Sequence, residues 1–287
     1  KHNKMITVNS ISGGKTSSYL AKHYPADYNV FALVTTTDKN CLYPDEKLRQ
    51  IVSDKIGKEF IGTLEEDVII KTIIELEQFI GTKIDWVSGK PFDEVIQRKG
   101  KTYLPNVTQR FCTTEMKLEP INDFWKKNIN ETCEMRIGFR ANEMSRAKKM
   151  IERCDENGVM WQKFIESTSE TGRNKWKNYP MRIPSFPLIN DNIYKDKIVE
   201  FWDKNKQVPF AYLNNCVGCF HRNPILLNHL SVKEPVKFEW FAKQERDTGY
   251  GQRTFKNGFS YDKIKKHRFQ HKLFDEDFNE CDSGYCG

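Results

Sequence analysis

The sequence of 287 residues contains no run of about 18 apolar residues, so no membrane-spanning helix is expected. Its first residues, Lys1 to Lys4, lack the apolar stretch of a secretory signal, which predicts a cytoplasmic protein. Internal repeats and low-complexity segments are also absent. Apolar residues make up 38% and charged residues 30%, as in chains that fold around a core. These features exclude fibrous, disordered and membrane-spanning classes.

Structural disulfides are not expected either, because they are rare in the reducing cytoplasm. The chain nevertheless has eight cysteines, and four of them form two closely spaced pairs. Cys216 and Cys219 form a C-x2-C motif, and Cys281 and Cys286 form a C-x4-C motif. Such spacing favours metal-binding or redox-active thiols. Cys133, in a strand-like segment, is expected to pack in the core.

Segments with strand character alternate with segments of helical periodicity through the first half of the chain. This order predicts an α/β fold in which crossover helices connect the strands of a parallel sheet. We expect strands at 5–8, 30–35, 58–61, 84–87 and 135–139, and helices at 68–80, 91–98, 116–127 and 193–204, with two more after the first strand and after Pro44. The pattern is irregular between 154 and 187. We therefore expect a nucleotide-binding domain at 1–185 and a region with metal-binding cysteines at 186–287.

A Gly-Gly turn joins the first expected strand to the following helix. Ser12-Gly13-Gly14-Lys15-Thr16-Ser17 combines glycines, hydroxyls and one lysine at a helix N-terminus. Backbone N–H groups of such a turn approach an anion closely, the helix dipole favours negative charge, and Lys15 adds a full charge. A Walker A loop would require glycine in place of Asn9, so only the end of that motif is matched. The turn predicts a phosphate site; a strand-to-helix turn without a ligand is the alternative.

Two later segments carry basic side chains, one between an expected loop and a helix and the other directly after an expected strand. Residues 109–120 place Arg110, Cys112 and Lys117 between a loop and a helix, where cations complement phosphate. Residues 137–146 follow a strand and contain Arg140 and Arg146, and arginine binds oxyanions in bidentate fashion. The structural alternatives are a solvated lysine and an exposed Arg–Glu pair, which contributes little energy.

Ser12 to Ser17 resembles the PP-loop of the ATP pyrophosphatase superfamily, in which the loop binds the β- and γ-phosphates and attack falls on the α-phosphate. The order of the motifs from Ile6 to about Arg222 resembles the phosphoadenosine phosphosulfate reductase-like family of that superfamily. The motifs are Tyr43-Pro44-Asp45-Glu46, Cys112 to Pro120, Gly138-Phe139-Arg140 and the C-x2-C pair. The segment Cys-Thr-x-x-x-Lys-x-x-Pro particularly resembles the ATP pyrophosphatase-like subunit of DNA phosphorothioation systems.

The resemblance implies an enzyme that uses ATP to adenylate an acceptor, releases pyrophosphate and prepares the acceptor for sulfur insertion. The residues implied in binding ATP and Mg²⁺ are Ser10, Ser12, Gly13, Gly14, Lys15, Thr16 and Ser17, with Asp38 near the adenosine. The implied catalytic cations are Lys15, Lys117, Arg140 and Arg146, which would stabilise the charge of the leaving pyrophosphate. The family usually has aspartate where this chain has Thr16.

The cysteines are compatible with more than one type of metal centre. Cys112, Cys216 and Cys219 match three of the four ligand positions of iron–sulfur members of the family, and Cys281 or Cys286 is the candidate fourth ligand. A [4Fe–4S] cluster is the preferred interpretation. Zn²⁺ bound by the pairs Cys216/Cys219 and Cys281/Cys286 is the alternative. A metal-free set of thiols is the third possibility.

The net charge of +7 and the basic clusters at 146–149, 173–177 and 263–268 favour nucleic acid as the acceptor. A solvated lysine-rich surface accounts for the same charge. A sulfur-donor protein is a further expected partner. Two other functions stay open. One is a sulfonucleotide reductase, whose Glu-Cys-Gly-x-His motif is matched here only by Glu280-Cys281; the other is a non-catalytic nucleotide- or nucleic-acid-binding module.

Overall fold

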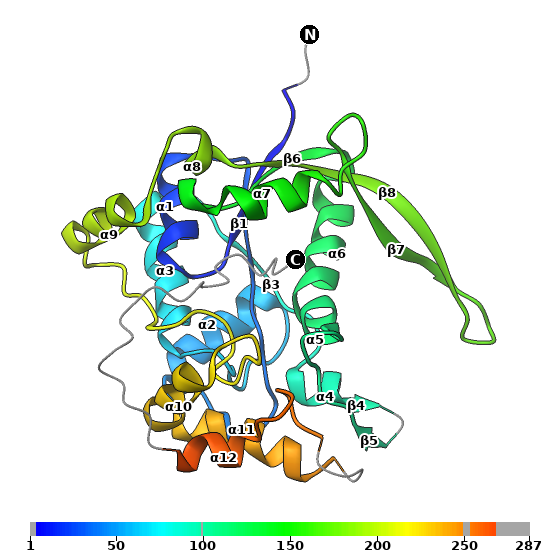
Figure 1. The fold of residues 1–287 in the computed structure, drawn as a ribbon. Helices are drawn as coiled ribbons and strands as arrows, with labels where there is room; N and C mark the ends of the chain where they lie inside the picture. Colours follow the sequence, from blue (N-terminus) through cyan, green and yellow to red (C-terminus); the bar gives the residue numbers. More distant parts are fainter. Residues whose placement is uncertain (1–3, 99, 249–252, 268–287) are drawn as a thin grey trace.

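The computed structural model describes residues 4–98, 100–248 and 253–267 (Figure 1). A six-stranded sheet has the strand order β3-β2-β1-β6-β8-β7. Its neighbouring strands are parallel except for β7 and β8, which are antiparallel. The predicted α/β fold with a parallel sheet is therefore confirmed. The strands are β1 (Thr7–Ile11), β2 (Tyr28–Ala32), β3 (Asp85–Val87), β6 (Cys133–Arg136), β7 (Met160–Thr168) and β8 (Asn174–Ser185), beside a small hairpin of β4 (Gln97–Arg98) and β5 (Lys101–Thr102).

Helices cover both faces of the sheet and gather beyond the carboxyl end of β2 (Figure 1). The longer ones are α1 (Lys15–His23), α2 (Glu46–Ile56), α3 (Val68–Ile80), α6 (Glu119–Asn128), α7 (Met144–Ile151), α9 (Lys195–Lys204), α10 (Pro224–Lys233) and α11 (Pro235–Arg246). The shorter ones are η1 (Lys39–Cys41), α4 (Phe92–Ile96), α5 (Phe111–Thr113), the π-helical η2 (Thr114–Leu118), η3 (Ala141–Glu143), α8 (Pro187–Asn190) and α12 (Tyr261–Lys266). Within the described residues, none of the helices has the length and apolar character needed to cross a membrane.

Three hydrophobic clusters hold these layers together. One packs α1, α3 and α9 against the sheet through side chains such as Leu20, Ile73 and Trp202. A second packs α6 against the opposite face around Trp125. The third joins α4 and the C-terminal helices α10, α11 and α12 to the loops that follow β2. Because side chains alternate along a strand, Val8 and Ile11 of β1 belong to clusters on opposite faces.

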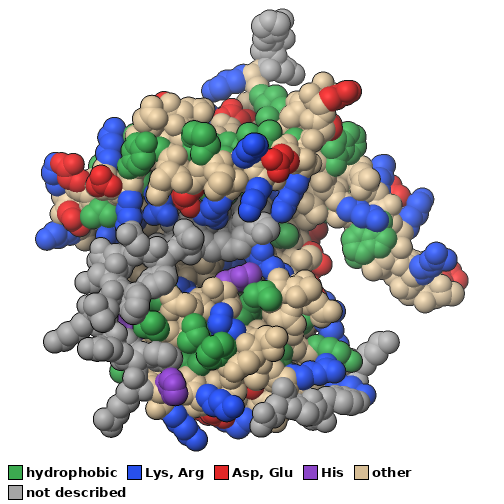
Figure 2. All heavy atoms as spheres, in the orientation of Figure 1, with side chains coloured by type: hydrophobic (Ala, Val, Ile, Leu, Met, Phe, Trp, Pro, Cys, Tyr) green, Lys and Arg blue, Asp and Glu red, His purple; other side chains and the backbone are tan. Residues whose placement is uncertain are grey.

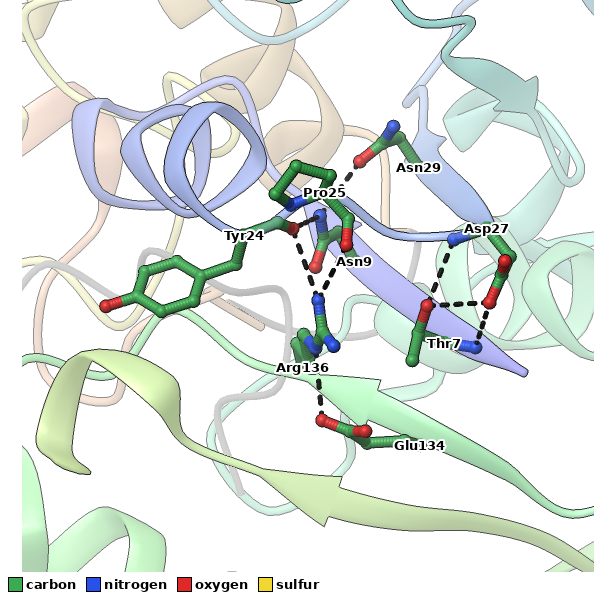
Figure 3. Close-up of polar contacts among 8 residues, drawn as sticks. All are labelled: Thr7, Asn9, Tyr24, Pro25, Asp27, Asn29, Glu134 and Arg136. Carbon is green, nitrogen blue, oxygen red and sulfur yellow. Dashed lines mark hydrogen bonds and ion pairs between the residues drawn. The ribbon is translucent and has the colours of Figure 1, made fainter. Parts of the chain in front are cut away.

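A polar network fixes the C-terminal end of α1 to the strands β1 and β6 (Figure 3). Arg136 of β6 donates to the carbonyl oxygens of Tyr24 and Pro25 at 3.3 and 2.9 Å. Asn9 of β1 donates to the same Tyr24 oxygen at 2.9 Å. A cation and an amide thus satisfy carbonyls that a helix end leaves without partners. With this end anchored, the N-terminus of α1 is held at the carboxyl edge of the sheet.

One predicted strand is wrong, and one hairpin was not predicted. The strand expected at 58–61 does not form, and only Gly62 makes isolated bridges there. The irregular segment 154–187 instead contains the two longest strands, β7 and β8, in a hairpin that projects from the sheet edge (Figure 1). Most of its side chains are exposed, so it lacks the alternation of apolar residues that marks a half-buried strand.

Candidate functional site

The sheet contains a topological switch point between β1 and β6. From β1 the chain continues to β2 and β3 on one side, whereas β6 and β8 lie on the other. Ligands of open α/β sheets bind at the carboxyl ends of the strands at such a point. The loops after β1 and β6 meet there: a Cβ added to Gly138 would lie 3.4 Å from the backbone N and Cα of Ser17. The predicted phosphate loop and the predicted Arg140 segment are therefore neighbours.

The loop Ser12–Ser17, hereafter the phosphate loop, forms a tight turn into α1. Gly13 has φ of +80°, and a Cβ on it would lie 2.9 Å from Cγ2 of Ile69, so glycine is required by both conformation and space. The Ser12 N–H donates to Oγ of Ser17 at 3.1 Å, and the two hydroxyls are 3.0 Å apart. Trp202 donates to the Lys15 carbonyl at 2.8 Å. The turn is thus held by its own backbone and hydroxyls and by the indole of Trp202.

Other residues predicted at the phosphate site have different surroundings. Ser10 lies on the opposite face of β1, in a small apolar cavity with Ile121 and Phe124. Asp38 accepts from the backbone N–H of Asn40 at 2.8 Å and so caps the short helix η1. A crevice of about 340 Å³ lies beside the segment that follows β2, at the ends of β2 and β3. Its lining includes Thr35, Thr36, Thr37, Lys58, Ser88 and Lys90.

Arg140 and Arg146 converge on one carboxylate. Arg140 pairs with Glu143 at 3.0 Å, and Arg146 pairs with the other oxygen of the same side chain. The guanidinium of Arg146 also lies 4.3 Å from the centre of the Phe139 ring. Two arginines share the single carboxylate of Glu143, so the side chains next to the phosphate loop keep a net positive charge. That charge favours binding of an oxyanion, which stays a prediction.

A second cavity, hereafter the cysteine cavity, brings together thiols that are distant in sequence. Cys112 of α5 and both cysteines of the C-x2-C motif, Cys216 and Cys219, line one space of about 60 Å³. Lys117, Arg110 and His221 also line it. The C-x2-C turn is fixed by Gly218, because a Cβ there would lie 2.3 Å from the Phe241 ring. The Gly218 carbonyl accepts from the hydroxyl of Tyr261 at 2.8 Å.

The thiols of this cavity are buried and surrounded by charge. Burial raises the pKa of Cys112 to about 11 and that of Cys216 well above its ordinary value, although Lys117 opposes the second shift. Burial alone would lower the pKa of Lys117, but Glu65 together with Cys216 and Cys219 raises it. In the metal-free protein Cys112 and Cys216 therefore stay protonated at neutral pH, and binding of a metal would release protons.

Lys117 is held by a carboxylate that the sequence analysis did not single out. Its Nζ lies 3.0 Å from Oε1 of Glu65, and the two side chains are 15% and 3% exposed. Glu66 and Asp67 pair in the same way with Lys233 and Lys237 of the C-terminal helices. Glu65, Glu66 and Asp67 directly precede helix α3. Each of them pairs with a lysine from another part of the chain.

The segment Leu64–Ile69 connects the phosphate loop to the cysteine cavity. The Leu64 carbonyl accepts from the N–H of Val217, within the C-x2-C motif, at 2.8 Å. Glu65 binds Lys117 in the cavity, and Ile69 contacts Gly13 of the loop. Four residues span at most about 14 Å, so Glu65 and Ile69 cannot be farther apart than that. The two predicted centres are therefore neighbours across one short segment.

The described residues include part of each predicted metal centre. Zinc needs four ligands, each about 2.0–2.3 Å from one ion. Within the described part of the chain, no three His, Cys, Asp or Glu side chains are grouped to hold one metal ion. A [4Fe–4S] cluster is bound by thiolates at separate iron atoms, so its ligands are spaced more widely. Cys112, Cys216 and Cys219 line one cavity, while Cys281 and Cys286 lie outside the described residues. Both the cluster and the zinc site therefore stay predictions.

No protein-family model and no curated protein matches the sequence. Among solved structures, the chain is similar to the U34-tRNA thiolase NcsA from Methanococcus maripaludis with its [4Fe-4S] cluster. The two are 15% identical, the similarity covers 99% of this chain and 81% of that chain, and the TM-score is 0.37.

Proposed function

We propose that this chain is an ATP-dependent enzyme of the PP-loop type that adenylates an acceptor in nucleic acid and thereby prepares it for sulfur insertion. The observation that carries the proposal is the set of contacts made by the segment Leu64–Ile69. It contacts Gly13 of the phosphate loop, Lys117 of the cysteine cavity and Val217 within the C-x2-C motif. A loop suited to polyphosphate and a group of thiols suited to sulfur chemistry are neighbours in one fold.

The phosphate loop would hold the β- and γ-phosphates of MgATP through backbone N–H groups and Lys15. An acceptor oxygen then attacks the α-phosphorus, and the bond from the α-phosphorus to the bridging oxygen breaks. Pyrophosphate leaves with the electron pair, and the acceptor carries AMP. Arg140, which follows Gly138 beside Ser17, and Arg146 of α7, which shares Glu143 with it, would neutralise the charge that develops on the leaving group. A sulfur nucleophile afterwards displaces AMP from the acceptor.

The cysteine cavity would hold a [4Fe–4S] cluster through Cys112, Cys216 and Cys219. When bound, such a cluster supplies a metal centre with affinity for sulfur at this position. This chain's own contribution is the buried charge around the thiols: Lys117, held by Glu65, balances the negative charge that the deprotonated cysteines introduce. The sulfur donor in this proposal is a separate protein or small molecule.

Nucleic acid is the acceptor that the charge of the chain favours. The net charge is +7, and Lys and Arg side chains lie along the upper part of the face in Figure 2 and on its projecting hairpin. Contacts to phosphates by such side chains release counterions, so binding should weaken steeply as salt increases. A small sulfonucleotide would show a far weaker dependence on salt.

The identity of the cleavage products tests the proposal. Protein purified without oxygen is incubated with ATP, Mg²⁺ and short RNA or DNA strands, and the nucleotides are separated by chromatography. AMP and pyrophosphate are expected. Lys15→Ala should abolish most of this activity, whereas Lys22→Ala in the same helix, which contacts Phe79, should retain it. ADP and phosphate as products would contradict the proposal, as would tight binding of a sulfonucleotide by a protein that does not cleave ATP.

A further inference from the structure

The β7–β8 hairpin is an arm with one covered and one uncovered face. Its strands pair in a single register from Trp161 opposite Pro180 to Ile165 opposite Trp176. Residues that are directly opposite share a face, and faces alternate along each strand. One face therefore carries Phe164 and Tyr179. The other, hereafter the open face, carries Trp161, Lys163, Ile165, Trp176, Asn178 and Pro180.

The covered face attaches the arm to the body. Phe164 stacks on Trp125 of α6 with ring centres 5.9 Å apart, and Tyr179 meets the same ring edge-on at 6.2 Å. Nζ of Lys126 lies 4.4 Å from the centre of the Phe164 ring. Phe164 is only 5% exposed. These contacts hold the base of the arm against α6 and leave the open face turned away from it.

The open face presents large apolar side chains to solvent. Trp161, Ile165 and Trp176 are 51%, 40% and 50% exposed. Trp161 donates through its ring nitrogen to Asp155 at 2.7 Å, which fixes the edge of the indole. Large apolar side chains that are exposed together on one face of a hairpin favour an interaction site. Figure 2 shows such hydrophobic surface on the projecting arm, beside Lys and Arg side chains.

The charges of the arm identify the class of partner. Residues 161–180 contain four basic side chains, Lys163, Arg173, Lys175 and Lys177, and two acidic ones, Glu166 and Glu170. Glu166 pairs with Lys175 and Lys177. Lys163 lies between the two tryptophans on the open face, with its Nζ 5.8 Å from the Trp176 ring. The centre of a protein interface is depleted of lysine, so a cation at the middle of this apolar surface favours a polyanion with flat rings.

We propose that the open face of the β7–β8 arm binds unpaired nucleotides of a nucleic acid, with bases stacked on Trp161 and Trp176 and a phosphate bound by Lys163. The inference rests on the proposed function in taking nucleic acid as the acceptor. Trp161 and the Ile165–Trp176 pair are four residues apart along β7, or about 13 Å. That length spans a few nucleotides of a single strand, which places Lys163 beside the backbone between two stacked bases. Stacking on aromatic rings needs exposed bases, so single strands should bind better than duplexes.

The test compares a fluorescent single strand of about 15 nucleotides with an abasic strand of the same length and charge, by anisotropy. The wild-type protein should prefer the strand with bases. Trp161→Ala and Trp176→Ala should each weaken binding of that strand by about tenfold and leave binding of the abasic strand unchanged. Trp176→Phe, which keeps a ring, should retain most of the affinity. Tyr103→Ala removes an aromatic ring of similar exposure away from the arm and should change neither affinity.

Equal affinity of the wild-type protein for both strands would overturn the inference without any variant. So would tryptophan variants that bind both strands as the wild type does, or that lose affinity for both equally. The cleavage of ATP is measured separately on the same proteins. Strand-specific losses in a protein that forms no AMP would leave the arm inference standing and contradict the proposed function. Formation of AMP by a protein whose arm variants bind both strands normally would support the proposed function and contradict the arm inference.

Discussion

The phosphate loop and the cysteine cavity are held in place by different kinds of interaction. The loop is built from backbone and hydroxyl groups: Gly13 has a positive φ, and Ser12 and Ser17 bind each other. The cavity and its surroundings depend on ion pairs between Glu65, Glu66 and Asp67 and lysines from other segments, of which the Lys117–Glu65 pair is buried on both sides. The loop should therefore respond mainly to changes of shape, and the cavity mainly to changes of charge.

The largest effect is expected from removing a charge beside the cysteine cavity. Lys117→Met should lower the free energy of unfolding by about 3–5 kcal/mol, because it leaves Glu65 buried without its partner. Unfolding in urea, followed by circular dichroism, measures this change. The double variant Lys117→Met/Glu65→Gln should recover part of the loss. Lys204→Met breaks the exposed pair with Glu200 and should cost less than about 1 kcal/mol. Equal costs for Lys117→Met and Lys204→Met would contradict this account of the cavity.

The dependence of stability on pH should also differ between Glu245, near the cysteine cavity, and Asp27, at the amino end of β1 away from the phosphate loop. Burial raises the pKa of Glu245, which accepts from the N–H groups of Phe255 and Tyr261 near the cavity, to about 7. The folded state then binds the proton more tightly than the unfolded state, so stability falls as pH rises from about 4.5 to 7. Hydrogen bonds from Thr7 instead lower the pKa of Asp27 below its ordinary value, so its contribution is present above pH 4 and lost in acid.

Glu245→Gln removes the first of these contributions. The loss of unfolding free energy between pH 5 and pH 8 should be smaller in this variant than in the wild type, by up to about 3 kcal/mol. Urea titrations at the two pH values give the comparison. Identical differences in the two proteins would show that Glu245 does not change its protonation in this range.

A smaller effect is expected from a change of shape in the phosphate loop. Gly13→Ala introduces a Cβ at φ of +80° and 2.9 Å from Ile69, so it should lower the free energy of unfolding by about 2 kcal/mol and weaken binding of an ATP analogue. Gly57→Ala is the matched control, because its φ of +69° imposes similar strain but no atom lies within 4 Å of the added Cβ. It should cost about 1 kcal/mol and leave nucleotide binding unchanged. Equal effects on binding would remove the special role of Gly13.

Local patterns predicted the central part of the fold. The helix at 68–80 and the turn at Ser12–Ser17 occur where the sequence indicated them, because helical periodicity and the conformational freedom of glycine act over a few residues. The hairpin β7–β8 was not predicted, since most of its side chains face solvent and it carries no regular apolar alternation.

Contacts between distant segments could not be read from the sequence. The C-x2-C motif was visible, but its position beside Cys112 depends on the packing of α11 and α12 against the loops after β2. The pairing of Lys117 with Glu65, 52 residues earlier, has no local signal. Asp38 shows the opposite case: a carboxylate after a strand suggested a ligand, whereas it caps its own short helix. Its predicted place near the adenosine stays a prediction, as does the division of the chain at residue 185.

The most direct test of the account measures nucleotide affinity and iron content on the same pair of variants. Lys15→Ala should weaken binding of a non-hydrolysable ATP analogue about tenfold in titration calorimetry and retain the iron of the wild type after anaerobic reconstitution. Cys216→Ser should lose most of that iron and keep its affinity for the analogue. Cys133→Ser, which changes a buried thiol in another cluster, should alter neither. Unchanged nucleotide affinity in Lys15→Ala, or full iron content in Cys216→Ser, would contradict the assignment of phosphate to the loop and metal to the cysteine cavity.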